Sequence, residues 1–206
     1  MGAPSTGSGG SGSNQAVINA LAMSGIMRRD IRSSFGGSSS TQAEGVPLSI
    51  KLRIRDTSCK ALEGAAIYLW HCDRSGNYSL YSQAIASENY LRGVQVTDDD
   101  GVVEFESIFP ACYSGRWPHI HFEVYPSLEN ATVYSNKLAT SQLALPKETC
   151  DTVFATDGYA ASITNLKMIS LTTDNVFSDG TSSQLASVSG SVSAGYEVEL
   201  DVNVKT

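Results

Sequence analysis

Residues 113–124 read YSGRWPHIHFEV, the stretch on which both the expected fold and the expected site depend. His119 and His121 are separated by Ile120 alone. In a β-strand successive side chains point to opposite faces, so both imidazoles would project from one face and Ile120 from the other. Two imidazoles on one face can share a metal ion, although two ordinary histidines on a strand would give the same pattern.

The residues just before this strand add further candidate groups. Tyr113 and Arg116 lie in a segment that Gly115 and Pro118 keep out of regular structure, so we expect a loop there. The loop would bring a phenol and a fixed cation close to the imidazoles. The chain has three histidines, and two of them stand in this short stretch, which favours a metal site.

Length and charge exclude several classes of protein. A chain of 206 residues is long enough for one domain with a sizeable core. No apolar run approaches the roughly 18 residues needed to span a bilayer. The formal net charge of −7 comes without a basic patch, so neither nucleic acid nor a membrane is an expected partner.

Alternating apolar and polar residues predict a mainly β fold. Residues 48–54 and 196–204 alternate cleanly, as expected for half-buried strands. Residues 65–72 are more continuously apolar, which indicates a central strand. We therefore predict a single-domain β-sandwich with short helical segments. Further strands are expected at 102–109, 119–125, 137–145 and 184–188, and short helices at 16–27 and 146–155.

Composition divides the chain into two parts. Residues 1–14 are rich in Gly and Ser and predict a flexible linker, and residues 15–206 would form the β-sandwich domain.

The four cysteines show no C-x-x-C spacing, which argues against a structural zinc site. Their even number favours two disulfides and an oxidising compartment, while four buried thiols in a cytosolic protein are the alternative.

Residue types alone leave the metal open. If His71 were the third ligand, three imidazoles would suit a catalytic zinc that ionises water. If tyrosines completed the site, their phenolates would favour a hard, highly charged ion such as ferric iron, because a free phenol ionises only near pH 10. Tyr113 can reach the histidines across its loop, and Tyr78 could do so from the turn after residues 65–72. Tyr81, Tyr90 and Tyr125 are alternatives to Tyr78.

Four stretches carry a resemblance to a known family. They are GAAIYLWHCDRSGNY (64–78), NYLRGVQVTD (89–98), IFPACYSGRWPHIHFEVY (108–125) and KLATSQ (137–142). With these motifs the sequence resembles the intradiol ring-cleavage dioxygenases, and it is most similar to their secreted branch. The spacing of Trp70 to Tyr78, together with Tyr…Arg-x-x-His-x-His, is the specific part of the match.

The resemblance implies roles for individual residues. Arg116 matches the family arginine that stabilises negative charge on the bound ring, and Gln142 matches a pocket glutamine. Tyr113 would leave the metal when substrate binds and would accept a proton from the substrate. His71 has no ligand role in the family. The residues that match the family's ferric ligands are Tyr78, Tyr113, His119 and His121.

The resemblance also implies an activity. A non-haem ferric enzyme, with Fe(III) as cofactor, would cleave a catecholic ring with O2 to a cis,cis-muconate-type diacid. The expected partners are therefore a small catecholic molecule and O2, and the protein would be secreted. The alternatives are a zinc hydrolase or lyase that uses His71, His119 and His121, and a non-catalytic β-sandwich binding module.

A disulfide hypothesis follows from the implied ligands. Because Cys72 and Cys112 each stand near a tyrosine that matches a ligand, a bridge between them would brace the metal site. Cys59 would then pair with Cys150. The family varies in oligomeric state, so the resemblance implies none for this chain.

Overall fold

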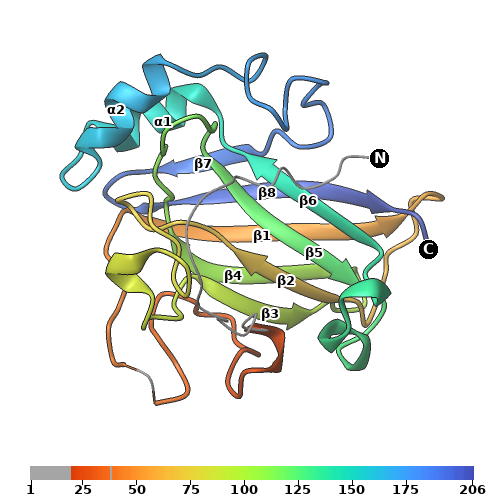
Figure 1. The fold of residues 1–206 in the computed structure, drawn as a ribbon. Helices are drawn as coiled ribbons and strands as arrows, with labels where there is room; N and C mark the ends of the chain where they lie inside the picture. The colour runs from red at the N-terminus through yellow and green to blue at the C-terminus, as the bar shows by residue number, and fades with distance from the viewer. Residues whose placement is uncertain (1–19, 38) are drawn as a thin grey trace, which may run out of the picture.

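The protein is a β-sandwich, as predicted, in which two four-stranded sheets pack face to face (Figure 1). The computed structural model describes residues 20–37 and 39–206, so the flexible segment predicted at 1–14 lies outside the described residues. The strands are β1 (Pro47–Asp56), β2 (Ala66–Trp70), β3 (Arg92–Val96), β4 (Val102–Ile108), β5 (His119–Tyr125), β6 (Ala139–Ala144), β7 (Ser187–Ser191) and β8 (Gly195–Val204).

Helices are short and lie outside the sheets. The two α-helices are α1 (Lys147–Phe154) and α2 (Ala160–Lys167), which contact each other at one end of the sandwich (Figure 1). Within the described part of the chain, no helix is long and apolar enough to cross a membrane. Single 3-10 turns occupy Ala20–Ala22, Gln83–Ile85, Glu129–Thr132 and Tyr134–Asn136.

The first sheet has the strand order β4-β1-β8-β7. β1 pairs antiparallel with β4 and parallel with β8, so the end of the chain lies beside its first long strand. The inward side chains of β1 are Leu48, Ile50, Leu52 and Ile54, all buried. Because they alternate with charged residues, one face of this sheet enters the core and the other faces solvent.

The second sheet has the strand order β3-β2-β5-β6 and carries the residues of interest. In β5, Ile120, Phe122 and Val124 enter the core between the sheets. His119 and His121 therefore project from the outer face of this sheet, as the alternation predicted. The site consequently lies outside the main core, on the face that a sandwich usually exposes.

A segment before β1 closes one side of the sandwich. Met27 bridges to Val94 of β3, and Asp30 bridges to Glu106 of β4, so this segment joins one edge strand of each sheet. The crossing is close at Gly93, where a Cβ atom would lie 2.5 Å from Ile31 Cγ2. A side chain at this position would separate the segment from β3.

The predicted disulfides are wrong: all four cysteines lie among the described residues and are free thiols. Cys59 is exposed after β1, whereas Cys150 is fully buried in α1. The Cys72 thiol donates to the Ala111 carbonyl and the Cys112 thiol to the Arg116 carbonyl, so neither bonds to the other. Three of the four pack as small apolar side chains. Secretion, expected from the same cysteines and the resemblance, stays a prediction.

Candidate metal centre

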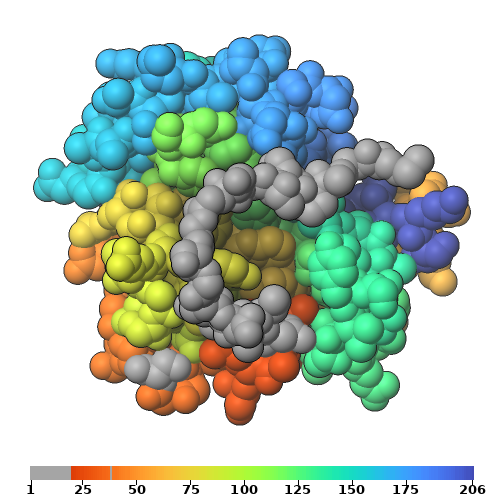
Figure 2. Space-filling model, viewed as in Figure 1, coloured from red at the N-terminus to blue at the C-terminus, as the bar shows by residue number. Residues whose placement is uncertain are grey.

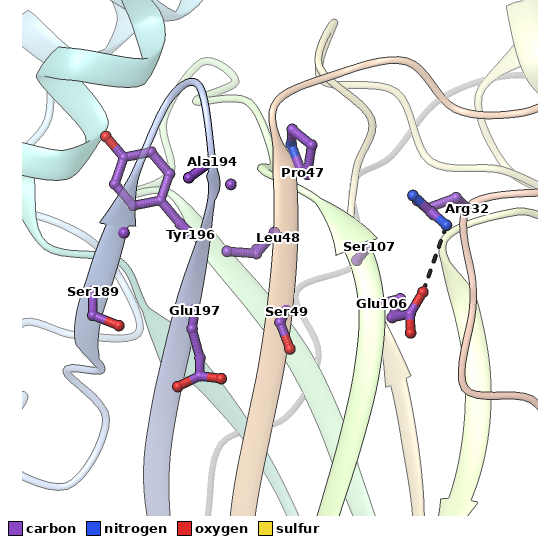
Figure 3. A pocket seen from close by; sticks show the side chains of 12 residues that line it. Arg32, Pro47, Leu48, Ser49, Glu106, Ser107, Ser189, Ala194, Tyr196 and Glu197 are labelled. Carbon is purple, nitrogen blue, oxygen red and sulfur yellow. Dashed lines mark ion pairs between the residues drawn. The ribbon is translucent and has the colours of Figure 1, made fainter.

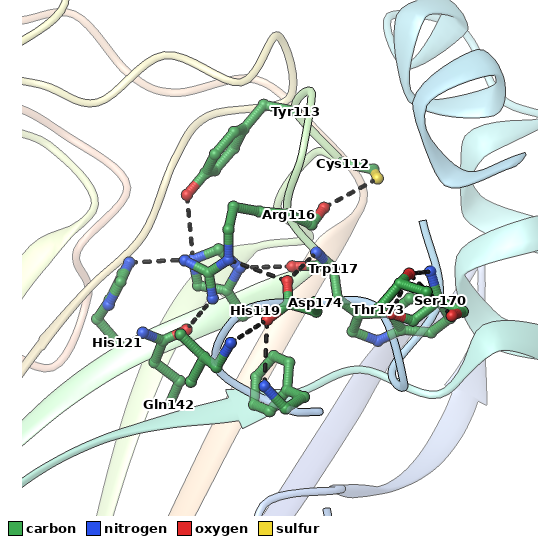
Figure 4. Close-up of polar contacts among 12 residues, drawn as sticks. Cys112, Tyr113, Arg116, Trp117, His119, His121, Gln142, Ser170, Thr173 and Asp174 are labelled. Carbon is green, nitrogen blue, oxygen red and sulfur yellow. Dashed lines mark hydrogen bonds and ion pairs between the residues drawn. The ribbon is translucent and has the colours of Figure 1, made fainter. Parts of the chain in front are cut away.

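Four polar atoms converge on the outer face of the second sheet. Tyr78 Oη lies 3.1 Å from His121 Nε2 and 3.3 Å from His119 Nε2. Tyr113 Oη lies 3.3 Å from His119 Nε2 and 3.5 Å from Tyr78 Oη, and the two Nε2 atoms are 3.0 Å apart. The fold thus brings together the four residues that the sequence analysis proposed as ligands, from β5 and two separate loops. Figure 4 shows three of them, Tyr113, His119 and His121.

These separations fit a single metal ion. Nitrogen and oxygen ligands bind at about 2.0–2.2 Å from a transition metal, so neighbouring donors on one coordination sphere lie roughly 3.3 Å apart. The observed range of 3.0 to 3.5 Å matches that spacing. Since the donors combine two imidazoles and two phenols, the set suits a hard, highly charged ion better than zinc.

The protonation states also suit metal binding. Burial lowers the pKa of His119 to about 4, with a further contribution from the cation of Arg116. Burial and the neighbouring His119 lower the pKa of His121 to about 2. Both imidazoles are therefore neutral at neutral pH, the form that binds metals. Burial raises the pKa of the Tyr78 and Tyr113 phenols, so their ionisation needs a nearby cation.

Hydrogen bonds hold the His119 ring in one orientation. Its Nδ1–H donates to the Trp117 carbonyl, which leaves the Nε2 lone pair directed at the cluster. Trp70 lies opposite His121 in the β2–β5 register, and their rings stack at 4.8 Å with an interplanar angle of 5°. Each imidazole therefore has a neighbour that fixes its plane before any metal binds.

His71 does not join this cluster. The residue is fully buried, its Nδ1 lies 2.8 Å from the Cys72 carbonyl oxygen, and its Nε2 lies 2.6 Å from Ser107 Oγ. Because both ring nitrogens already have partners, the three-histidine zinc site considered from the sequence lacks its third ligand. Among the described residues, no group of three or more His, Cys, Asp or Glu side chains could hold a metal.

Arg116 lies beside the cluster and is held by two side chains. Its Nε donates to Asp174 Oδ2 at 2.9 Å, and its terminal nitrogen donates to Gln142 Oε1 (Figure 4). Gln142 pairs with His121 across β5 and β6, so both project from the same face. The structure thus brings Arg116 and Gln142 into direct contact next to the four converging donors.

Asp174 is the residue that sequence reasoning missed. It is fully buried, and its Oδ2 also accepts the Trp117 backbone N–H at 2.7 Å. Burial by itself would raise the pKa of this carboxyl, but the hydrogen bonds from Trp117 and Arg116 outweigh burial and lower it. Asp174 lies in an irregular segment 58 residues after Arg116, so no local pattern could have indicated the pair.

A cleft opens beside the donors. Its cavity volume is about 470 Å³, in the range of small-molecule sites. Figure 2 looks onto this face, where the segments that follow β2 and β5 flank a hollow with β2 at its floor. The lining residues include Tyr78, Tyr113 and His121.

A second hollow lies on the outer face of the other sheet and has fewer side chains that could bind a metal or take part in catalysis. Figure 3 shows it over β1, β4 and β8, with Arg32 paired to Glu106. Arg32 also pairs with Asp30, so its charge is already balanced. The described residues that line this hollow include no histidine or cysteine.

Comparison with known proteins identifies the family. A family model described as Dioxygenase matches residues 32–140, more than half of the chain. The structure is similar to that of an intradiol ring-cleavage dioxygenase from Tetranychus urticae, with a TM-score of 0.70 and 25% identity over 87% of each chain. The chain belongs to the intradiol ring-cleavage dioxygenase family.

Sequence relatives match a shorter region. The chain is 45% identical over 60 residues to a chlorocatechol 1,2-dioxygenase of Rhodococcus opacus, which covers 29% of this chain and 23% of that protein. It is 37% identical over 74 residues to a catechol 1,2-dioxygenase of Candida albicans, which covers 34% of this chain and 24% of that protein. The match therefore spans about a quarter of the length of these relatives.

Proposed function

We propose that the protein is a ferric intradiol dioxygenase, which cleaves a catecholic ring between its two hydroxyl-bearing carbons and incorporates O2 to give a cis,cis-muconate-type diacid. The observation that carries the proposal is the convergence of two phenol oxygens and two imidazole nitrogens at separations of 3.0 to 3.5 Å. Membership of the dioxygenase family supports the same activity. The names of the relatives, catechol and chlorocatechol 1,2-dioxygenase, support a catecholic substrate.

The proposed ligands are Tyr78, Tyr113, His119 and His121, with Fe(III) as the metal. Two phenols with raised pKa values and two neutral imidazoles form a set that favours a hard trivalent cation. Ferric iron bound there would supply Lewis acidity toward the catechol oxygens, which would make the bound ring reactive toward O2.

The tyrosines give the chain its own proton acceptor. A catechol loses two protons when both of its oxygens bind a metal. Tyr113 stands on the loop before β5 rather than on a strand, so it can move more readily than the two histidines. Its Oη, as the phenolate, is the atom that would accept one of these protons, and the second would pass to water or hydroxide in the cleft.

Arg116 acts next to the reacting ring in this proposal. Its guanidinium, fixed by Asp174 and Gln142, would stabilise negative charge that develops on the bound ring. Gln142 would orient the arginine and limit its movement. These two contacts let the cation face the substrate without reorganisation during the reaction.

The test is a visible absorption spectrum of purified protein with iron measured on the same sample. We expect a broad phenolate-to-ferric band that shifts to longer wavelength when catechol is added without oxygen. Tyr78→Phe should weaken both the band and iron retention, while Tyr196→Phe, in β8 of the other sheet, should change neither. Protein that stays colourless after reconstitution with iron would contradict the proposal.

A further inference from the structure

The cleft beside the donors is larger than one catechol ring requires. Its volume of about 470 Å³ is in the range that holds drug-sized ligands, whereas catechol is a single ring with two hydroxyl groups. We infer that the substrate is a catechol that carries a second, uncharged aromatic ring, which lies along the aromatic floor of the cleft; this inference rests on the proposed function. The residues that line the cleft are Tyr68, Trp70, Tyr78, Tyr81, Ser82, Arg92, Tyr113, His121 and Glu123.

A row of stacked rings leads away from the metal cluster. Trp70 stacks on His121, and Tyr68 stacks on Trp70 with centroids 4.8 Å apart and an interplanar angle of 19°. Tyr68 and Trp70 are two residues apart on β2, so both point to the outer face of the sheet. Because each stacked ring covers the face of its neighbour, the row presents ring edges to the cleft, and it begins at a proposed metal ligand, where the reacting ring would bind. A ring attached to the catechol would therefore meet these edges in edge-to-face contact.

The far end of this row is fixed by a buried arginine. Arg92 of β3 donates to Tyr68 Oη at 2.9 Å, and it donates to Ser79 Oγ and to the Ser79 carbonyl at 3.0 and 2.8 Å. Its Cζ lies 5.1 Å from the ring centroid of Tyr81. The guanidinium of Arg92 thus lies between Tyr68, at the end of the row of stacked rings, and the ring of Tyr81.

Tyr81 is the residue of this row that a ligand would cover. Its side chain is 71% exposed although it lines the cleft. An exposed aromatic ring held over a cation offers a preformed stacking surface. Since Tyr68, Trp70 and Arg92 are already fixed by their neighbours, contact with a second ring would require little ordering of the protein.

The charges of the cleft favour an uncharged substituent. Arg92 is the only cation among the described residues that line it, and each of its three nitrogens already donates a hydrogen bond. Glu123 brings a carboxylate, which accepts from Tyr125 Oη and Lys137 Nζ. A carboxylate on the ring would lose water and would have to compete with Tyr68 and Ser79 for the Arg92 guanidinium, while the Glu123 carboxylate lies in the same lining. The residues that line the cleft therefore favour an uncharged aromatic substituent on the catechol.

The test compares three catechols that differ only at one ring position: catechol, 3,4-dihydroxybiphenyl and protocatechuate. With iron-loaded protein, kcat/KM from oxygen uptake should be at least fivefold higher for the biphenyl than for catechol, and lowest for protocatechuate. Dissociation constants from quenching of tryptophan fluorescence, measured without oxygen, should follow the same order. A biphenyl that binds no tighter than catechol would overturn the inference.

A pair of variants locates the effect. Tyr81→Ala should reduce the biphenyl-to-catechol ratio several-fold in both measurements. Tyr134→Ala is the matched control, because Tyr134 is equally exposed at 71% but does not line the cleft, and it should leave the ratio unchanged. An unchanged ratio in Tyr81→Ala would also overturn the inference. If iron-loaded protein turned over none of the three compounds, the proposed function would fail, and the binding ratio would still decide the inference.

Discussion

The ion pair of Arg116 with Asp174 predicts a large effect for a nearly isosteric change, Asp174→Asn. Asp174 Oδ2 accepts from Arg116 Nε and from the Trp117 N–H, while Oδ1 accepts from the N–H groups of Val176 and Phe177. An asparagine has one oxygen, so its amide NH2 must face one of these two pairs of donors. Two hydrogen bonds to a charged group are lost whichever way the side chain turns.

The magnitude follows from burial. The Asp174 side chain is 0% exposed and that of Arg116 is 16% exposed, so water cannot replace the lost acceptor. Removing one partner of a buried pair costs about 3–5 kcal/mol. For a chain of this length, that corresponds to a fall in Tm of roughly 10 °C. Thermal unfolding followed by circular dichroism at pH 7 measures it.

Glu199→Gln is the matched control for charge. Glu199 accepts from Arg53 and Lys51, but these side chains are 22 to 31% exposed, and exposed pairs contribute about 0–1 kcal/mol. If Asp174→Asn lowered Tm no more than Glu199→Gln, the reasoning would be refuted.

The dependence on pH provides a second check on Asp174. Hydrogen bonds lower the pKa of this carboxyl in the folded state. The stability that the ionised carboxylate adds to the folded protein is therefore present at pH values above its pKa in the unfolded chain, which is near 4. The contribution is lost as the pH falls through the folded value, since the folded carboxyl then also binds a proton. The Tm difference between wild type and Asp174→Asn should therefore shrink in acid.

Three further predictions follow from the same structure. Arg116→Ala should retain iron, measured per chain, but lower kcat about a hundredfold, because a preorganised charge is lost; loss of iron instead would mean that Arg116 supports the metal site. Burial lowers the pKa of His71 to about 4 in the folded protein, so the unfolded chain binds a proton at this residue more readily. Acidification from pH 6.5 to 4 should therefore reduce the free energy of unfolding of wild type by about 3 kcal/mol more than that of His71→Gln, as measured by urea unfolding. Equal shifts of the urea midpoint in the two proteins would contradict this. Protein that has not been reduced should show four thiols that react with a disulfide reagent in denaturant, and in the native protein only the Cys59 thiol should react. Fewer than four reactive thiols in denaturant would mean that the protein does contain a disulfide.

Local patterns predicted most of the strands but missed the strand β3 and the α-helix α2. The strand expected at 119–125 is β5 itself, and the alternation at 48–54 and 196–204 lies within β1 and β8. β3 was not predicted because it is five residues long and contains Gly93, whose role depends on a distant segment. α2 was also missed, because its sequence AASITNLK has little apolar periodicity.

The candidate site divides in the same way. Spacing alone put His119 and His121 on one face, because strand periodicity is a local property of the backbone. Residue type alone could not choose Tyr78 over the other tyrosines, and that choice came from a family resemblance. Only the fold brings Tyr78 Oη within 3.3 Å of both imidazoles.

What the sequence by itself determined is what depends on neighbours along the chain: the mainly β class, the face of β5 that carries the histidines, and the loop that carries Tyr113. What only the tertiary structure decided depends on contacts between distant segments. These are the parallel pairing of β1 with β8, the free state of the cysteines, and the buried contact of Asp174 with Arg116. Such contacts form because burial leaves a charge or an apolar side chain only one stable set of partners, and no spacing in the sequence encodes that choice.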